Sequence, residues 1–122
     1  MTVSELKYLM AINELYDGSV GIKLVSIADR MKISKVSVYK TVVKLDEKGY
    51  VKRDENNKVI MTAQGHEQLE LYNKLIGYLY EHFRYNCNIS AETAYNDAVS
   101  AVCALSDESR QALIARIAEQ NR

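Results

Sequence analysis

The clearest alternation of apolar and polar positions lies in segment 34–48. Its apolar side chains recur at intervals of four and three residues, at Val38, Val42 and Leu45. This spacing lines one face of a helix, and Lys40 and Lys44 fall elsewhere around it. Ser34 is suited to cap the first turn, and Gly49 supplies the left-handed residue with which many helices end. The pattern therefore predicts a helix over 34–48 with one apolar and one basic side.

The segments on either side complete a known order of elements. Just before this helix, a shorter apolar pattern predicts another helix over 25–31, with Lys32-Ile33 as the turn. Just after it, 50–53 and 58–61 are predicted to be strands joined around Asn56-Asn57. Helix, tight turn, second helix and hairpin is the order of a winged helix-turn-helix domain.

The start of the chain predicts a helix that supports this domain. Thr2 and Glu5 have the spacing of a capping box, in which each side chain bonds the other residue's amide. The apolar stripe that follows continues to about Tyr16, and its residues Leu9 and Ile12 are expected to pack behind the helix over 34–48. A short third strand is expected over 22–24.

The second half of the chain predicts long helices that need a second subunit. Thr62 is placed to cap a helix whose part 68–83 is apolar almost all round. An alanine-rich helix follows, and a last amphipathic helix begins at Ser106. Because a short chain can hardly wrap such a helix alone, a two-fold dimer is favoured over a monomer with an internal helix. The residues expected at the dimer interface are Leu71, Tyr72, Leu75, Tyr78, Leu79, Ala98 and Val102.

Together these elements predict a mostly α fold with a small β-hairpin wing. A winged helix-turn-helix DNA-binding domain is expected over 1–62, and a helical linker and dimerisation domain over 63–122. The chain has 122 residues and is 48% hydrophobic, enough to build a core. No apolar run is long enough to cross a bilayer and no secretion leader opens the chain, so a cytoplasmic protein without a membrane partner is expected. Cys87 and Cys103 are expected to be free thiols.

Charge is distributed unevenly, although the formal net charge is zero. Residues 1–62 carry eleven Lys and Arg against eight acids, whereas 63–122 carry five against eight. Segment 32–58 alone has eight basic and four acidic residues. This excess coincides with the second helix and the hairpin, and it favours a nucleic-acid partner over a merely solvated helix face.

The expected partner is double-stranded DNA. A helix in the major groove presents side chains to base edges, and Lys40 is the first choice for such a contact. Hydroxyl groups near the helix start are suited to phosphate oxygens, and the hairpin is expected to reach the backbone or the minor groove. The predicted DNA-binding residues are Ser34, Lys35, Ser37, Lys40, Thr41, Lys44, Lys52, Arg53, Asn56, Asn57 and Lys58.

Several runs resemble one family of regulators. LVSIADRMKISKVSVYKTVVKLDEKGYV followed by KVIMTAQG is similar to the DNA-binding half of the iron- and manganese-dependent repressors, the diphtheria-toxin-repressor family. YLMAINELYDG resembles that family's first helix, and NISAETAYNDAVSAVCALSDES resembles the helix that carries metal ligands. The resemblance implies a dimeric repressor whose second half forms the dimer, without the small-barrel third domain of some members.

The resemblance also implies iron or manganese, but the ligand positions depart from the family. The register gives Lys7 and Met10 on the first helix, Gly77 or a neighbour on the linker helix, and Val99, Val102 and Cys103 on the later one. A cation and aliphatic side chains do not bind a divalent ion, which needs several N, O or S donors. We therefore expect no metal cofactor at these positions, and expect Val99 and Val102 to be core residues. A rearranged site using Glu81, His82, Cys87 and Cys103, with His66 and Glu67 upstream, is the less favoured alternative.

The sequence thus predicts a repressor-like, sequence-specific transcriptional regulator that acts as a homodimer on an inverted-repeat operator. One alternative is a metal-responsive repressor with a rearranged site. Another is a winged-helix protein-interaction module without DNA binding. An unknown small molecule, or oxidation at Cys103 or Cys87, is a possible control. An enzyme is not expected, because no nucleophile, base and orienting group occur together and no phosphate-binding glycine loop is present.

Overall fold

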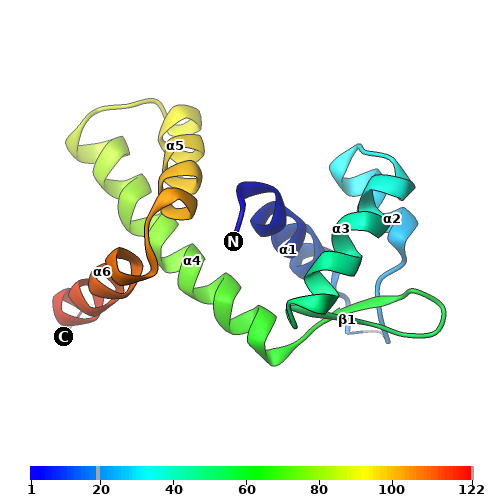
Figure 1. Ribbon diagram of the computed structural model, residues 1–122. Helices are drawn as coiled ribbons and strands as arrows, with labels where there is room; N and C mark the ends of the chain where they lie inside the picture. Colours follow the sequence, from blue (N-terminus) through cyan, green and yellow to red (C-terminus); the bar gives the residue numbers. More distant parts are fainter. Residues whose placement is uncertain (19, 122) are drawn as a thin grey trace. The chain divides into compact units, whose positions relative to one another are not determined.

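The computed structural model describes residues 1–18 and 20–121. The chain divides into two compact units, Met1–Leu69 and Glu70–Arg122, each of which is described by itself. The helices and the single hairpin drawn in Figure 1 confirm the predicted fold class, mostly α with a β-hairpin wing followed by a helical part. No helix in the described residues is long and apolar enough to cross a membrane.

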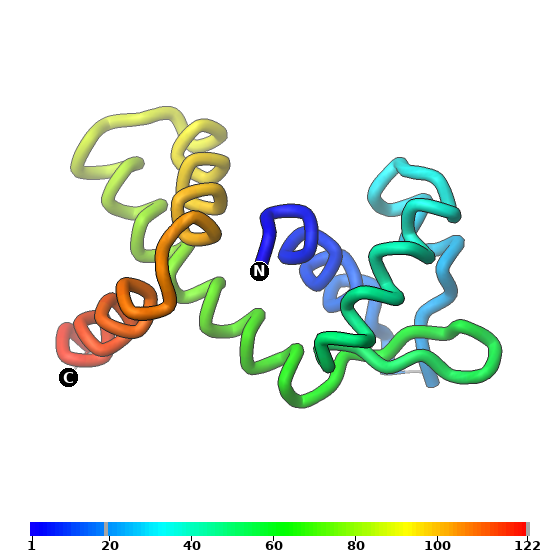
Figure 2. The backbone as a smooth tube through the Cα atoms, viewed as in Figure 1, coloured from blue at the N-terminus to red at the C-terminus, as the bar shows by residue number. Residues whose placement is uncertain are grey.

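The first unit follows the predicted order of elements. Helices α1 (Val3–Leu15), α2 (Leu24–Met31) and α3 (Lys35–Glu47) precede strands β1 (Val51–Arg53) and β2 (Val59–Met61). The two strands are antiparallel, with Lys52 opposite Ile60. The predicted third strand is reduced to one bridge, Ile22 to Val59, because Leu24 already begins α2. Figure 2 follows the backbone from α3 through this hairpin into α4.

The core of this unit is built from the predicted apolar stripes. Val38, Val42 and Leu45 are fully buried on the inner side of α3, which confirms the stripe read from the sequence. α1 contacts α2 and β2, and α3 contacts α2 and β1. The other side chains that fill the interior include Leu6, Leu9, Ile12, Ile27, Val51 and Val59.

Local hydrogen bonds explain where the helices of this unit begin and end. Thr2 and Glu5 form the predicted capping box, with both bonds at 3.1 Å. Ser34 Oγ accepts a bond from Ser37 N, as predicted, and Gly49 has a φ of 84° just past α3. Glu5 is buried, and its Oε2 accepts a 2.6 Å bond from Lys48 Nζ. This bond ties the start of α1 to the end of α3.

The hairpin passes directly into α4 (Ala63–Glu81) through a close contact at Gly65. Thr62 Oγ1 accepts a bond from Gly65 N, which confirms its predicted capping role, and donates one to the carbonyl of Gly49. A Cβ added at Gly65 would lie 2.1 Å from the carbonyl oxygen of Tyr50 and 2.7 Å from Met61 Cγ. The backbone of α4 therefore approaches the hairpin as closely as only glycine permits.

The second unit contains the rest of α4, a π-helical turn η1 (His82–Asn86), α5 (Ala91–Ala104) and α6 (Asp107–Gln120). Ala94, Ala98, Val99 and Val102 are buried in α5, so Val99 and Val102 are core residues as predicted. Arg110 of α6 is also buried. Its guanidinium donates to the carbonyl oxygens of Val102 and Leu105 at the end of α5 and lies 5.3 Å from the Tyr72 ring of α4. One side chain thus joins all three helices.

Candidate nucleic-acid interface

The outer side of α3 carries most of the residues predicted to bind DNA. Lys35, Ser37, Lys40 and Lys44 are exposed, and Thr41 is half-buried. The buried stripe fixes how α3 is rotated against the core. Because successive residues turn by about 100° around a helix, Ser37, Lys40 and Lys44 face away from the stripe, whereas Lys35 and Thr41 lie on its two flanks.

The two serines at the start of α3 act first on the helix itself. Ser34 Oγ accepts from Ser37 N at 3.1 Å and donates to Ser37 Oγ at 2.9 Å. Ser34 therefore forms the N-cap and is exposed, which confirms its predicted capping role. Its second predicted role, a contact with a phosphate, stays a prediction.

The wing is held in shape by Asp54. Its Oδ1 accepts bonds from the amides of Asn56 and Lys58, at 2.8 and 2.9 Å. Asn57 has a φ of 59°, a left-handed conformation that asparagine tolerates better than most residues. Lys52, Asn56 and Asn57 are exposed and Lys58 is half-buried, so the predicted hairpin residues lie at or near the surface.

Arg53 occupies a different environment from the other predicted cations. Its Nε donates to Asp46 Oδ2 of α3 at 2.9 Å, and its guanidinium lies 5.8 Å from the ring centre of Tyr39. The bond to Asp46 raises the pKa of the Arg53 guanidinium above its usual value. Arg53 therefore joins the wing to α3, and only part of its side chain is left for another partner.

The structure adds two surface residues of α3 that the sequence reasoning missed. Val36 is 65% exposed and Tyr39 is 44% exposed, beside the predicted cations. Exposed apolar groups on a helix with polar neighbours are suited to contact methyl groups or sugars of a ligand. The signal was present in the sequence, since both residues fall outside the stripe of Val38, Val42 and Leu45.

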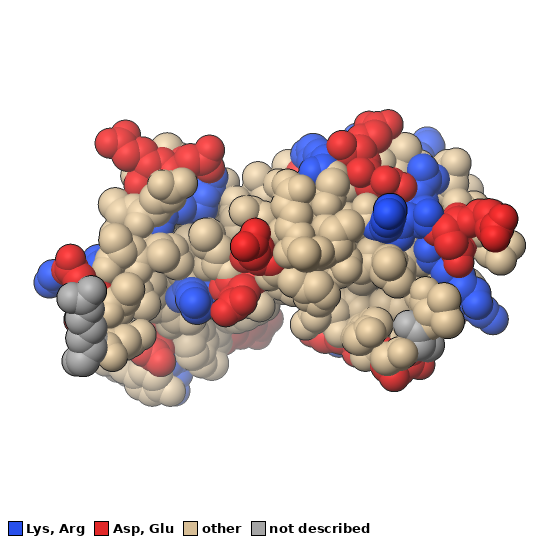
Figure 3. Space-filling model, turned by 90° about the horizontal axis from the view of Figure 1, so that it is seen from below, with Lys and Arg blue, Asp and Glu red and all other residues tan. Residues whose placement is uncertain are grey.

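Lys23 is a third residue that the sequence reasoning missed. It lies at the N-cap of α2 and shares a cavity of about 320 Å³ with Lys35 of α3 and Lys58 of the wing. Asn56 and Asn57 complete the polar part of the lining. Figure 3 shows blue Lys and Arg side chains gathered, with red carboxylates among them, at the right-hand end of the view, the end that the wing occupies in Figure 1.

The residues predicted at a dimer interface fall into two groups. Tyr72, Leu75, Ala98 and Val102 are at most 2% exposed, so they pack inside one chain and offer no surface to a second subunit. The prediction is corrected for these four, because α4 and α5 use them for their own packing. Leu71, Tyr78 and Leu79 are half-buried and remain candidates for contact with a partner.

The side chains at the positions that the sequence resemblance assigns to the family's metal ligands do not fit iron or manganese. Val99 and Val102 offer no donor atom and are buried, and Lys7 carries an exposed ammonium group. Met10 and Cys103, both half-buried, are the remaining donors, and a divalent ion is rarely held by so few. Among residues 1–18 and 20–121, no group of three or more His, Cys, Asp or Glu is placed to hold a metal ion.

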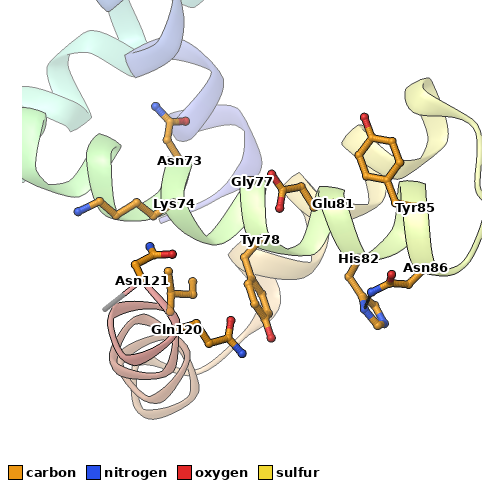
Figure 4. A pocket seen from close by; sticks show the side chains of 11 residues that line it. Asn73, Lys74, Gly77, Tyr78, Glu81, His82, Tyr85, Asn86, Gln120 and Asn121 are labelled. Carbon is orange, nitrogen blue, oxygen red and sulfur yellow. Dashed lines mark hydrogen bonds between the residues drawn. The ribbon is translucent and has the colours of Figure 1, made fainter.

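A cavity of the second unit lies between α4, η1 and α6, and both polar and apolar side chains line it. Its volume is about 680 Å³. Figure 4 shows Tyr78 extending from α4 toward the end of α6 that carries Gln120 and Asn121, and His82 beside Asn86. Gly77 lies in the middle of this α4 face, and a Cβ added there meets nothing within 4 Å.

Comparison with known proteins finds a family match for most of the first unit. Residues 1–59 match the family described as "Iron dependent repressor, N-terminal DNA binding domain". The hypothetical protein SSo2273 from Sulfolobus solfataricus has 26% sequence identity and a TM-score of 0.75, covering 98% of this chain and 91% of that one. No curated protein matches the sequence.

Two regulators share the fold at lower identity. The manganese regulator SloR has 22% identity and a TM-score of 0.73, with 96% of this chain covered and 54% of that one. The metal-dependent transcriptional regulator MtsR has 19% identity and a TM-score of 0.69, with coverage of 96% and 54%. The chain thus spans about half the length of each of these two proteins.

Proposed function

We propose that the chain is a transcriptional regulator that binds double-stranded DNA. The premise is that residues 1–59 belong to the N-terminal DNA-binding domain family of the iron-dependent repressors, as the resemblance in the sequence implied. The observation that carries the proposal is the outer face of α3. Its lysines and hydroxyl groups are exposed, while Val38, Val42 and Leu45 hold the opposite face in the core. A helix anchored in this way is suited to enter the major groove.

The residues divide by role. We assign Lys40, near the middle of the exposed face, to a base edge, with Lys35, Ser37, Thr41 and Lys44 beside it on bases or phosphates. In the wing, Lys52, Asn56, Asn57 and Lys58 reach the DNA backbone or the adjacent minor groove. Arg53 serves mainly to hold the wing against α3, because its Nε bonds to Asp46.

The proposed regulator acts as a homodimer on an inverted repeat. A two-fold dimer places two recognition helices about one helical turn of DNA apart, which matches a palindromic operator. Half-buried Leu71, Tyr78 and Leu79 of α4 supply apolar area for the interface, and Gly77 on the same helix lets another backbone approach closely.

We further propose that DNA binding does not depend on the family's metal. Two of the corresponding positions are buried valines and a third is a lysine, so the donor set lacks the charge and the ligands that a divalent ion needs. Control by a small molecule or by oxidation of a cysteine remains compatible with this proposal, since Cys87 is exposed and Cys103 is half-buried.

Selection from a pool of random duplexes tests DNA recognition. We expect an enriched palindromic motif and an affinity that falls with salt, with a slope of about −0.9 for each phosphate neutralised. Lys40→Ala should change the preferred sequence, whereas Lys58→Ala should weaken all sequences alike. Weak binding without an enriched motif would contradict the proposal and favour a protein-interaction module.

Metal dependence is tested separately with protein purified without chelator. We expect no stoichiometric iron, manganese or zinc, and the same affinity for the selected operator before and after addition of EDTA. Loss of binding in EDTA that Mn²⁺ restores would show instead that a rearranged site exists.

A further inference from the structure

Three lysines from three different elements line one small cavity of the first unit. Lys23 precedes α2, Lys35 begins α3, and Lys58 directly precedes the return strand β2 of the wing. The cavity has a volume of about 320 Å³, and Leu24, Val25, Asn56 and Asn57 complete its lining. Because the three lysines are far apart in the sequence, the cluster exists only in the folded unit.

The lining contains no acidic residue. Other cations of this unit are neutralised within the chain, since Arg30 pairs with Glu14, Lys48 with Glu5, and Arg53 with Asp46. Among the described residues, no ion pair is formed by Lys23, Lys35 or Lys58. Like charges that share a cavity without a counter-charge repel one another, and an anion between them would add attractions to each lysine that outweigh this repulsion.

The wing side of the cavity is held in place by bonds that leave the Lys58 ammonium free. Two acids, Asp54 and Glu55, come just before this side in the sequence. Asp54 Oδ1 accepts the backbone amides of Asn56 and Lys58, and neither acid lines the cavity. The turn is therefore fixed by the carboxylate, while the Lys58 ammonium and both asparagine side chains are left to the cavity. Asparagine side chains add neutral N–H donors, which an oxyanion also accepts.

We propose that this cavity binds a single phosphate group, and that in the DNA complex it is one phosphate of the operator backbone. The proposal rests on the proposed DNA-binding function and deepens it, because it adds Lys23 and assigns Lys35 and Lys58 to the same phosphate. A tetrahedral oxyanion has enough oxygens to accept bonds from ammonium groups on three sides. A phosphate held between α2, α3 and the wing fixes the register in which α3 meets the bases.

Operators with one neutral methylphosphonate at a time identify the phosphate. In the wild-type chain, we expect one position in each half-site where the neutral group weakens binding. Lys23→Ala, Lys35→Ala and Lys58→Ala should each reduce the sensitivity at that same position, and the triple variant should abolish it, whereas Lys44→Ala should leave it intact. Lys7→Ala, at an exposed position of α1, is the control for general loss of charge. Three lysines that map to three different phosphates would overturn the proposal.

The salt dependence gives an independent count. If the three lysines share one phosphate, the triple alanine variant changes the slope by about 0.9 per subunit, whereas three separate phosphates give a change of about 2.7. The variant should remain folded, because Lys23 and Lys35 are exposed, Lys58 is half-buried, and Lys23 makes no capping bond. Its thermal midpoint, measured beside the wild type, verifies this.

Inorganic phosphate tests the cavity without DNA. NMR titration should shift the amides of Leu24, Val25 and Asn57 in the wild type and in Lys7→Ala, but not in the triple variant. If the chain binds no operator yet these amides shift, the DNA function fails while the cavity is a site for a free phosphate compound. If operator binding is normal but neither the mapping nor the titration points to the cavity, the phosphate site alone is refuted.

Discussion

Val36 and Val38 are the same amino acid two positions apart in α3, yet the first is 65% exposed and the second fully buried. The difference follows from helical geometry, because two residues along a helix differ by about 200° around its axis. The same geometry places Tyr39 and Lys40 beside Val36 on the outer face. The inner side chains of α3 therefore stabilise the fold, and the outer side chains are the ones that we propose to contact DNA.

This pair of valines allows a matched test of burial. Val38→Ala should lower the free energy of unfolding by about 2 kcal/mol, from roughly 0.8 kcal/mol for each buried CH₂ group and the cavity left behind. Val36→Ala removes the same atoms from the surface, and its effect should stay within about 0.5 kcal/mol. Chemical denaturation measures both, and equal losses would show that α3 is rotated differently.

Glu5 should make stability depend on acid pH. Burial raises the pKa of its carboxyl, but bonds from Lys48 and Thr2 outweigh burial, so the pKa lies below the ordinary value of 4.5. A carboxyl with a lowered pKa stabilises the fold above its unfolded pKa, and this stabilisation disappears as pH falls through its folded pKa. The free energy of unfolding should therefore decline below about pH 4.5.

Glu5→Gln provides the comparison for this pH effect. The variant should be less stable than the wild type at pH 7, and its stability should change less between pH 5 and pH 3, because the titrating group is gone. Unfolding curves across this range measure the difference, and parallel profiles for the two proteins would assign the acid sensitivity to other carboxyls.

At the scale of elements, the wing is fastened to α3 by Arg53 and Asp46 as well as by the backbone. We expect Asp46→Asn to weaken this link, so that the amides of β1 and β2 exchange hydrogen faster while α1 and α2 are unaffected. Glu47→Gln removes a neighbouring, exposed acid of the same helix and serves as the control. Unchanged exchange in Asp46→Asn would mean that the hairpin is held by its own pairing alone.

In the second unit, the side chain of Arg110 is the group that joins α4, α5 and α6. Arg110→Ala would remove bonds to two carbonyl oxygens at the end of α5 and the contact with Tyr72, and should cost about 2 to 4 kcal/mol. Arg116→Ala breaks an exposed pair with Glu119 and should cost at most about 1 kcal/mol. Denaturation of the two variants side by side tests this ranking, and similar losses would contradict the role given to Arg110.

On the scale of the whole molecule, the features that could be predicted are those that depend on residues close in sequence. Caps at Thr2, Ser34 and Thr62, and the stripe on α3, need only residues close in sequence, and all were confirmed. The predictions were least successful where distant segments meet. Burial of Arg110 and the cavity at Lys23 depend on three elements each, and periodicity alone does not say which neighbour covers an apolar face.

The same limit affected the prediction of the dimer surface. The apolar pattern of α4 shows which residues must be buried, but it does not show whether α5 or a second subunit buries them.

Gly77 offers a test of the remaining surface. In one chain a Cβ added at Gly77 meets nothing within 4 Å and Gly77 is exposed, so Gly77→Trp should leave the subunit folded and block close approach of another subunit. We expect this variant to sediment as a monomer at concentrations where the wild type is a dimer.

Glu67→Trp adds similar bulk to an exposed position of the same helix and should leave association unchanged. Dimerisation of Gly77→Trp with wild-type strength would exclude this face of α4 from the interface.

The contact at Gly65 has a consequence for how this architecture tolerates sequence change. Since the carbonyl of Tyr50 occupies the space that any β-carbon would need, even alanine would have to push the first turn of α4 off the hairpin. The angle at which α4 leaves the wing thus depends on the absence of a β-carbon at Gly65. A single-nucleotide change that replaces this glycine would be enough to alter the angle.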